Sequence, residues 1–289
     1  MKNIFKNAVT YGLYPVLLAA VITVAAAAMT YRWNYQATYV GLTLFLVVTL
    51  VTIERIFPLS EKWAMTGKSF LRDLKYIAID APTIALTKTA FGMGAIYYSE
   101  THQGIFTTSP LLVGVIGFLL VFEFFQYWFH RFCHEGKGKI GRFFWRAHLA
   151  HHLPNKVYVV MHAVFNPINV FITTAIIQTP LILLGISPEA TLAATLVIDL
   201  QSLVSHFNVN LRVGFLNYLF IGTETHRFHH SAKVDEAKNY GNTLVVWDII
   251  FGTFYRNPGT VPENLGMQQP NEYPDSNAAL KVIAFPFKT

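Results

Sequence analysis

Residues 110–129, "PLLVGVIGFLLVFEFFQYWF", form a stretch in which Glu123 is the one charged side chain. A helix needs about 20 mostly apolar residues to cross the hydrocarbon core of a bilayer, so this stretch predicts a membrane-spanning helix. The chain continues directly into "HRFCH", where His130 and His134 are four positions apart and share one face if the helix continues. The sequence therefore predicts a membrane span whose end carries a pair of histidines.

Composition places the whole chain among integral membrane proteins. Of its 289 residues, 53% are hydrophobic and 13% are charged, whereas soluble domains have about 25% charged residues. The formal net charge of +6 suits nucleic acid, anionic lipid or the retained side of a membrane protein. Because so much of the chain is apolar, we expect membrane and lipid contacts and no nucleic-acid partner. The single cysteine, Cys133, excludes an internal disulfide and leaves nitrogen and oxygen atoms as the metal ligands.

Other apolar stretches also predict helices of the membrane region. They are residues 12–29, 38–57, 76–98, 163–184 and 190–205. The first has a signal peptide as its alternative, because Lys2 and Lys6 precede it and small residues end it. The third contains Asp80 and Lys88, so it is either a span or a partly buried helix.

The last two apolar stretches are joined by the turn-like "GISPEA". They either cross the membrane separately or form a hairpin that enters and returns. We therefore expect an all-α fold of multi-pass transmembrane helices, with about four spans plus a hairpin. No repeat or linker divides the chain, so we expect a single membrane-integral domain, 1–289.

Lysine and arginine residues are unevenly distributed between the predicted loops. Residues 54–75 contain five and residues 130–156 contain six, whereas residues 99–109 contain none. Loops rich in lysine and arginine stay on the cytoplasmic side. We therefore expect both termini and every histidine cluster on the cytoplasmic side of a bacterial inner membrane or the endoplasmic reticulum. The polar part of the chain would then form a cytoplasmic helical cap.

Eight of the eleven histidines fall into three short clusters. These are "HRFCH" (His130, His134), "HLAHH" (His148, His151, His152) and "HRFHH" (His226, His229, His230). Positions three and four apart share a helix face, so each cluster can direct its rings toward one point. A single histidine is usually a hydrogen-bonded core residue, but burying eight rings costs roughly 1 to 3 kcal/mol each unless every ring finds a partner. A metal ion supplies that partner.

The number of histidines indicates two metal ions, because one ion accepts only about four to six ligands. His206 in "SHFNVN" is a ninth candidate, since it ends an apolar helix shortly before the third cluster. Its alternative is a hydrogen-bonded core residue. His162 is a weaker candidate, and His102 lies in the predicted outer loop, where we expect it to be solvated.

Three carboxylates are candidates for orienting these ligands. Glu123 precedes His130 by seven residues and Asp199 precedes His206 by seven, which is two helical turns on one face. Asp248 lies in the late stretch "NYGNTLVVWDIIFGTFYR". A carboxylate that accepts a hydrogen bond from the other ring N–H orients a ligand histidine and makes its ligating nitrogen more basic. The alternatives are a pair between Glu123 and a nearby arginine, and plain packing for the segment around Asp248.

The chemistry of the metal follows by elimination. Imidazole suits zinc, copper, iron and nickel, but the H-E-x-x-H motif of zinc proteases is absent. Bis-histidine haem would use histidines singly on facing helices. A pair of iron ions at the membrane surface fits best, and such a site can bind oxygen and oxidise a C–H bond of a lipid chain.

The order and gaps of the clusters HxxxH, HxxHH and HxxHH resemble the fatty acid hydroxylase superfamily, which includes sterol desaturases and C-4 methylsterol oxidases. The supporting stretches are "YWFHRFCH", "WRAHLAHH", "SHFNV", "THRFHH" and "NYGNTLVVWDIIFGTFYR". The resemblance covers residues 123–256, which are therefore the expected catalytic region.

This resemblance implies a non-haem di-iron monooxygenase that hydroxylates or desaturates a lipid, sterol or isoprenoid. It would use O2 and two electrons from a separate donor such as cytochrome b5 or ferredoxin with its reductase. The family's ligands correspond to the eight cluster histidines, and His206 matches a further histidine of many members. Zinc could replace iron during purification. Where many members carry an Arg-x-His-Pro-like stretch, this chain reads "MHAVFNPIN", which leaves the role of His162 and the substrate preference open.

Two other functions stay open. A non-catalytic metal handler, such as a transporter or sensor, would distribute histidines along its spans, and their clustering argues against it. A membrane zinc hydrolase would remain active without oxygen.

Overall fold

The computed structural model describes residues 2–288, and every regular element in this range is a helix, with no strand among them. The prediction of an all-α fold is thereby confirmed. The helices are α1 (Lys2–Asn7), η1 (Ala8–Gly12), α2 (Leu13–Thr30), α3 (Tyr35–Ile56), η2 (Glu61–Trp63), α4 (Gly67–Ser99), α5 (Leu111–Glu135), α6 (Gly138–His152), η3 (Val159–Ala163), α7 (Pro167–Leu183), α8 (Pro188–Ser205), η4 (Gly214–Tyr218), α9 (Thr223–His229), α10 (Val246–Ile250), η5 (Pro270–Glu272), α11 (Ala279–Ile283) and η6 (Phe285–Phe287).

Three helices among the described residues are long and apolar enough to cross a membrane: Ile4–Thr30, Tyr35–Ile56 and Leu111–Glu135. They contain the stretch predicted at 12–29 and all but one residue of each of those at 38–57 and 110–129. The stretch predicted at 76–98 lies in the 33-residue helix α4, whose inward face is polar. The number of spans and the cytoplasmic side of the cap stay predictions.

Contacts between Cα atoms divide the chain into two compact units. Unit 1 comprises the chain up to Ala64, Lys156–His162 and Pro188–Leu265. Unit 2 comprises Met65–Asn155, Ala163–Ser187 and the chain from Gly266 onward. The two stretches that could have formed a hairpin, now α7 and α8, thus belong to different units. The prediction of a single domain, 1–289, stays a prediction.

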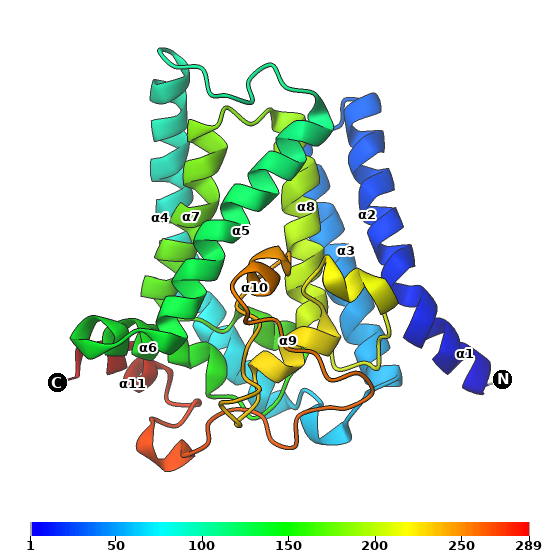
Figure 1. Cartoon of the computed structure of the whole chain (residues 1–289), viewed down its shortest axis with the longest axis vertical. Coiled ribbons are helices and arrows are strands. Elements are labelled where there is room, and N and C mark those ends of the chain that lie inside the picture. Colours follow the sequence, from blue (N-terminus) through cyan, green and yellow to red (C-terminus); the bar gives the residue numbers. More distant parts are fainter. Residues whose placement is uncertain (1, 289) are drawn as a thin grey trace. The chain divides into compact units, whose positions relative to one another are not determined.

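Unit 1 is built around α8, which packs against α2 and α3 (Figure 1). Leucines at intervals of four residues line the buried face of α3 and recur on α8, as expected for helix packing. The hydroxyl of Thr43 on α3 donates to Asp199 on α8. This bond joins two side chains inside an apolar bundle and adds one polar contact to the packing of the two helices.

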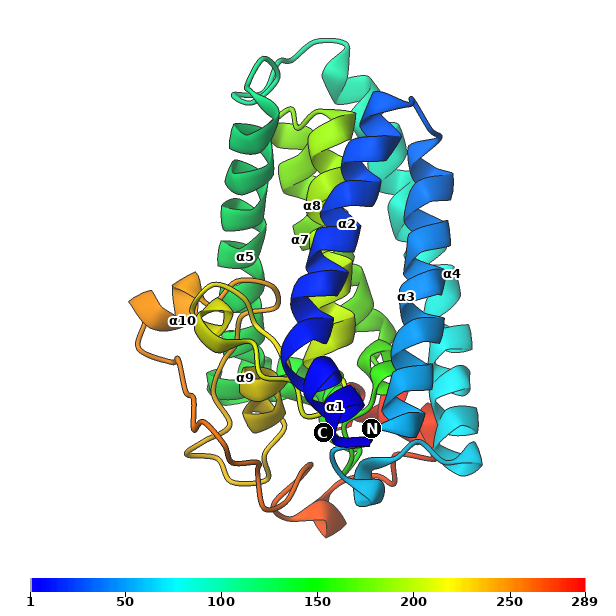
Figure 2. The ribbon, with the colours of Figure 1, turned by 90° about the vertical axis from the view of Figure 1, so that its right-hand side faces the viewer.

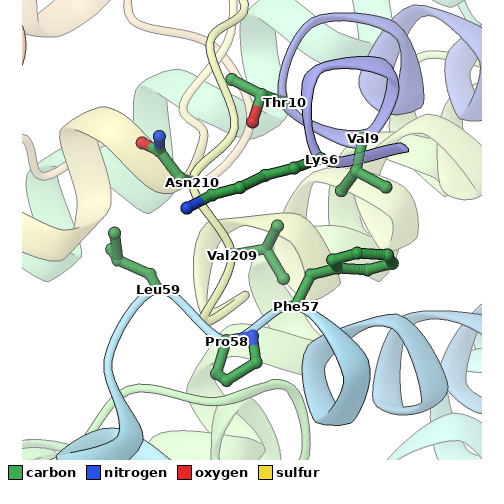
Figure 3. Close-up of a pocket in the computed structure, with 8 residues that line it drawn as sticks. All are labelled: Lys6, Val9, Thr10, Phe57, Pro58, Leu59, Val209 and Asn210. Carbon is green, nitrogen blue, oxygen red and sulfur yellow. The ribbon is translucent and has the colours of Figure 1, made fainter. Parts of the chain in front are cut away.

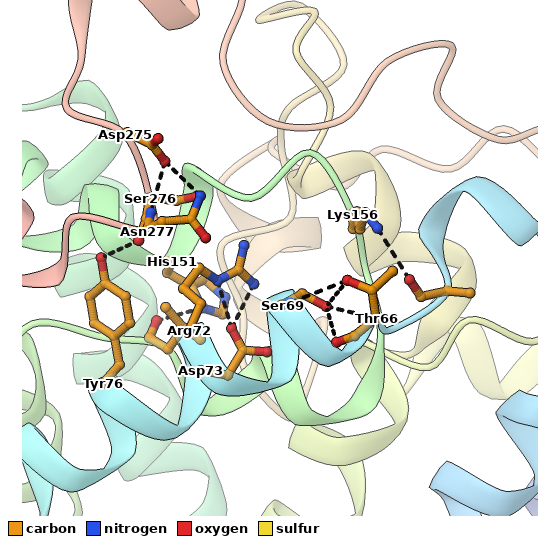
Figure 4. A network of polar contacts seen from close by, with 12 residues as sticks. Thr66, Ser69, Arg72, Asp73, Tyr76, His151, Lys156, Asp275, Ser276 and Asn277 are labelled. Carbon is orange, nitrogen blue, oxygen red and sulfur yellow. Dashed lines mark hydrogen bonds and ion pairs between the residues drawn. The ribbon is translucent and has the colours of Figure 1, made fainter.

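Unit 2 is built around α7, which lies beside α4 and α5 in both views (Figure 1, Figure 2). Helix α6 follows α5 and packs against it. The C-terminal helices of the chain close this unit: α11 packs against α4 and α6, and η6 packs against α6. The hydroxyl of Tyr76 on α4 donates to the carbonyl of Ser276, 3.0 Å away (Figure 4). The chain from Gly266 onward is thus packed into this unit.

The buried face of α4 is polar for most of its length. The buried side chains at helical spacing are Ser69, Arg72, Asp73, Tyr76, Asp80 and Thr87. Arg72 and Asp73 form an ion pair 2.6 Å apart (Figure 4). Asp80 is 2% exposed, and neither of its carboxylate oxygens has a hydrogen-bond partner among the described residues. A carboxylate buried in this way costs stability, because the hydration it loses is not replaced.

We expect Asp80→Leu to stabilise the protein. Leucine removes the desolvated oxygens, so the free energy of unfolding should rise by about 1 to 3 kcal/mol. Thermal unfolding in detergent measures this as a midpoint several degrees higher. The control is Asp73→Leu, which breaks the buried pair with Arg72 and should lower the midpoint. A lower midpoint for Asp80→Leu would contradict the expectation.

Candidate metal centre

Four histidines converge in unit 2. His130 and His134 lie four residues apart on α5, and His148 and His152 lie four residues apart on α6. One potential ligand atom of each lies within 4.8 Å of those of the others. The Nε2 atom of His148 is 3.0 Å from the Nε2 atoms of both His130 and His152. The helical spacing therefore brings His130 and His134 together with His148 and His152, but His151 of the second cluster is not among them.

A tight turn between α5 and α6 makes this convergence possible. The chain reverses through Gly136 and Gly138, and Gly138 adopts a φ of +71°, which favours glycine. A Cβ atom on Gly141 would stand 2.1 Å from the backbone of Gly136. Only glycine at position 141 therefore lets the first turn of α6 approach the end of α5 so closely.

Hydrogen bonds determine which nitrogen of His148 can act as a ligand. Its Nδ1 atom is 3.0 Å from the side-chain oxygen of Asn169, whose amide nitrogen donates to Thr173. The asparagine oxygen accepts, so Nδ1 carries the hydrogen and Nε2 keeps a free lone pair. Burial lowers the pKa of His148 to about 4, which keeps the ring neutral, as a metal ligand must be.

His151 is on the same helix, and its ring stacks on Phe165 with 4.5 Å between ring centroids. Its Nδ1 atom lies 3.3 Å from the carbonyl oxygen of Val164. A ring held on one face and at Nδ1 can present only Nε2 to a ligand. The structure thus gives His151 the tautomer that metal binding requires.

Three histidines converge in unit 1. His206 follows the last residue of α8, and His226 and His230 lie four residues apart, on α9 and directly after it. The Nε2 atom of His206 is 3.1 Å from those of His226 and His230, which are 3.2 Å from each other. His206, the ninth candidate of the sequence, is therefore placed with the third cluster.

His206 is oriented by the end of its own helix. Its Nδ1 atom lies 2.9 Å from the hydroxyl of Ser205 and 3.2 Å from the carbonyl of Ser202. Because the Ser205 hydroxyl itself donates to that carbonyl, it accepts from Nδ1–H. The Nε2 lone pair is left facing the two other rings. Burial lowers the pKa of His206 to about 3, so this ring is neutral.

The two histidine sets, His130/His134/His148/His152 and His206/His226/His230, each fit a metal ion. Nitrogen ligands bind zinc or a similar ion at about 2.0 to 2.1 Å, so two ligands of one ion are about 3.0 to 3.4 Å apart. The Nε2 separations given above match this spacing. Every donor is an imidazole nitrogen, which suits iron, zinc, copper and nickel. Each set could therefore hold one ion.

Asp248 acts on the segment that follows α9. Its carboxylate accepts from the backbone N–H groups of Tyr240 and Gly241, both at 2.8 Å, and from the hydroxyl of Thr253 at 2.7 Å. The neighbouring carbonyl of Lys238 lies 3.0 Å from Nδ1 of His229. Asp248 therefore fixes the segment that orients His229. That it tunes a metal ligand stays a prediction.

The other two predicted carboxylates lie on long helices, Glu123 on α5 and Asp199 on α8. Asp199 accepts the hydroxyl of Thr43, and Glu123 is fully buried on α5. Of the arginines considered as partners for Glu123, Arg131 pairs with Glu135 at 2.7 Å. Arg146 donates to the carbonyl of Lys288. The roles of Glu123 and Asp199 toward the histidines stay predictions.

Two further histidines, His162 and His102, lie outside the three clusters. The ring centroid of His162 lies 6.0 Å from that of His206, and burial lowers the pKa of His162 to about 4. It is thus a half-buried neighbour of the unit 1 set. His102 is exposed and contacts the hydroxyl of Thr101, as expected for a loop residue.

Sequence reasoning missed Glu54, which holds the turn that carries His206. Glu54 ends α3 and is 4% exposed. One of its oxygens accepts from the N–H groups of Asn208 at 2.9 Å and Val159 at 3.1 Å. The side chain of Asn208 in turn bonds both backbone groups of Ser60. The sequence did show an acidic residue near the end of an apolar stretch. It could not show the partners of Glu54, because they are far away in the sequence.

The comparisons with known proteins agree with this geometry. Residues 115–253 match the family described as fatty acid hydroxylase. The chain is similar to the ornithine lipid hydroxylase OlsE of Rhizobium tropici, with 27% identity over 90% of this chain and 80% of the relative. It is also similar to the alkylglycerol monooxygenases of Homo sapiens and Danio rerio, at 32% and 30% identity. These matches cover 46% and 44% of this chain and 28% and 27% of the relatives. No solved structure matches.

We expect Glu54→Leu to weaken metal binding by the unit 1 set selectively. Without the carboxylate, the N–H groups of Val159 and Asn208 lose their acceptor and the turn after His206 loosens, so affinity should fall about tenfold or more. Titration with Co²⁺, followed by visible absorption, measures the two sets as separate phases.

Two variants control this measurement. Glu54→Gln keeps an acceptor oxygen and should bind nearly as well as the wild type. Thr43→Val removes a different α3–α8 hydrogen bond and should leave both affinities unchanged. Equal weakening of both sets in Glu54→Leu would show general destabilisation instead.

Proposed function

On the premise that the chain belongs to the fatty acid hydroxylase superfamily, we propose that it hydroxylates a C–H bond of a membrane lipid with O2 at two iron ions. The chain is an oxygen-dependent oxidoreductase, as its hydroxylase and monooxygenase relatives indicate. The observation that carries the proposal is the pair of histidine sets, each with imidazole nitrogens at the spacing of ligands to one ion.

The eight cluster histidines and His206 are the proposed iron ligands. They are His130, His134, His148, His151, His152, His206, His226, His229 and His230. Two iron ions, when bound, would supply the activation of O2 that organic side chains cannot provide. Zinc could occupy the same nitrogens as purified, because imidazole suits both metals.

The protein's own residues would hold the ligands in one protonation state. Asn169, the carbonyl of Val164, Ser205 and the carbonyl of Lys238 face Nδ1 atoms of four of these rings. Each acceptor keeps the ring hydrogen on Nδ1 and the lone pair on Nε2. Apart from the half-buried His134, these histidines are at most 6% exposed, which limits the access of bulk water to the site.

Hydroxylation requires reductant as well as oxygen. One oxygen atom enters the C–H bond and the other leaves as water, so each turnover consumes one O2, two electrons and two protons. We propose a separate electron donor, such as cytochrome b5 or a ferredoxin with its reductase. Desaturation of the same substrate would follow from a second hydrogen abstraction.

The proposed substrate is a lipid with a polar head group, presented from the bilayer. The relative that aligns over most of the chain is named for ornithine lipid, and the shorter matches are named for alkylglycerol. Helix α5 carries His130 and His134 at one end and exposes apolar side chains such as Leu112, Ile116 and Phe125 along its length. A lipid tail can therefore lie against the same helix that carries metal ligands. We place the site on the cytoplasmic side because the lysine- and arginine-rich segments adjoin it.

The decisive test is isotopic. Protein purified with minimal handling should contain about two iron ions per chain by elemental analysis. Incubated with membrane lipid extract, a reducing system and ¹⁸O2, it should give a lipid product carrying one ¹⁸O atom, detected by mass spectrometry. Product formation without O2, or oxygen derived from water, would support a zinc hydrolase and overturn the proposal. Metal binding with no lipid product would support a metal handler.

We expect His130→Ala and His226→Ala each to abolish hydroxylation, because each removes a ligand from a different set. Iron content should fall from about two to about one per chain in either variant. His102→Ala is the matched control, since this histidine is exposed in a loop, and it should retain activity and both ions. Full activity of either ligand variant would contradict the assignment.

A further inference from the structure

A small cavity lies in unit 1 where α1, η1 and the turns after α3 and α8 meet (Figure 3). Its volume is about 80 Å³. It is lined by Lys6, Val9, Thr10, Phe57, Pro58, Leu59, Val209 and Asn210. Since one water needs roughly 10 to 15 Å³ of such volume, the cavity has room for a group of about five heavy atoms.

The polar side chains of the cavity are all able to donate hydrogen bonds. They are the ammonium group of Lys6, the hydroxyl of Thr10 and the amide of Asn210, and the Thr10 hydroxyl points toward the Lys6 side chain (Figure 3). Within the part of the chain that the structure describes, none of the three has a hydrogen-bond or ion-pair partner. Thr10 is only 7% exposed, whereas Asn210 is half-buried and Lys6 is exposed.

A π-helical turn shapes this site. The turn Ala8–Gly12 interrupts the helix that begins at Lys2, and π turns occur often at functional sites. The carbonyl of Thr10 leaves the helical pattern and accepts from the N–H of Arg212 at 2.8 Å. The turn thus joins α2 to the segment after α8 while directing the Thr10 side chain into the cavity.

The cavity lies at the level where membrane helices end. One candidate span begins at Ile4 and another ends at Ile56, and both ends contribute to its lining. At this depth the hydrocarbon core gives way to lipid head groups. We propose that this cavity binds the phosphate group of an anionic membrane phospholipid.

Charge and size both favour this occupant. A phosphate has five heavy atoms, carries negative charge and accepts several hydrogen bonds. The Lys6 ammonium supplies the opposite charge, and the Thr10 hydroxyl and Asn210 amide supply neutral donors. The apolar lining from Val9, Phe57 and Val209 faces the glycerol end of the lipid. The bound lipid would connect the N-terminal helix to the turn that follows His206.

The test uses the full-length protein in detergent with phosphatidylglycerol as the probe, and native mass spectrometry or the thermal midpoint as readout. Phosphatidylglycerol should bind the wild type and raise its midpoint. Diacylglycerol, which lacks the phosphate, and inorganic phosphate, which lacks the tails, should both bind far more weakly.

Three variants distinguish specific binding in the cavity from nonspecific electrostatic attraction between the lipid and the protein surface. Lys6→Met and the isosteric Thr10→Val should each weaken phosphatidylglycerol binding about tenfold. Lys62→Met is the matched control: it removes one exposed positive charge from the same unit without touching the cavity, and it should change binding less than about twofold. Equal losses for Lys6→Met and Lys62→Met, or wild-type binding by Thr10→Val, would overturn the proposal. Inorganic phosphate binding as tightly as the lipid would also overturn it.

Discussion

The close approach of imidazole nitrogens is the constraint on which both units depend. In unit 1, three Nε2 atoms lie 3.1 to 3.2 Å from one another, and the ring of His206 already uses Nδ1 for the end of α8. Lone pairs this close repel each other unless a proton or cation lies among them, and burial removes the water that would otherwise separate them. The fold therefore brings together lone pairs that a bound cation would satisfy.

Each unit meets this constraint with backbone structure that is local to the histidines. In unit 2, the glycines at 136 and 141 permit a turn so close that α6 returns onto α5. In unit 1, the buried carboxylate of Glu54 accepts from the N–H groups of Asn208 and Val159, and Asp248 holds the segment after α9. Acids buried beside a metal centre can thus act through the backbone, because two N–H groups satisfy a carboxylate without a second charge.

Helix α4 packs differently from the apolar helices of unit 1. Unit 1 packs leucine and alanine faces together, whereas α4 of unit 2 buries polar side chains and exposes apolar ones such as Leu71 and Leu86. A helix of this kind suits a bilayer, where the lipid solvates apolar side chains and the protein interior must satisfy polar ones. This reversal explains why α4 was predicted less clearly than the three apolar spans.

The sequence by itself determined the helical class, the three helices apolar enough to span a membrane and the histidine pairs at helical spacing, because hydropathy and a period of 3.6 residues act over short distances. It also indicated His206, which follows an apolar helix directly. Only the tertiary structure decided that His206 meets His226 and His230, that Glu54 holds the turn beyond it, and that Asp199 bonds to Thr43. These pairs are separated by up to 156 residues, and no local pattern encodes which helix ends will meet. Their meeting depends on packing of whole helices, which is a property of the folded chain.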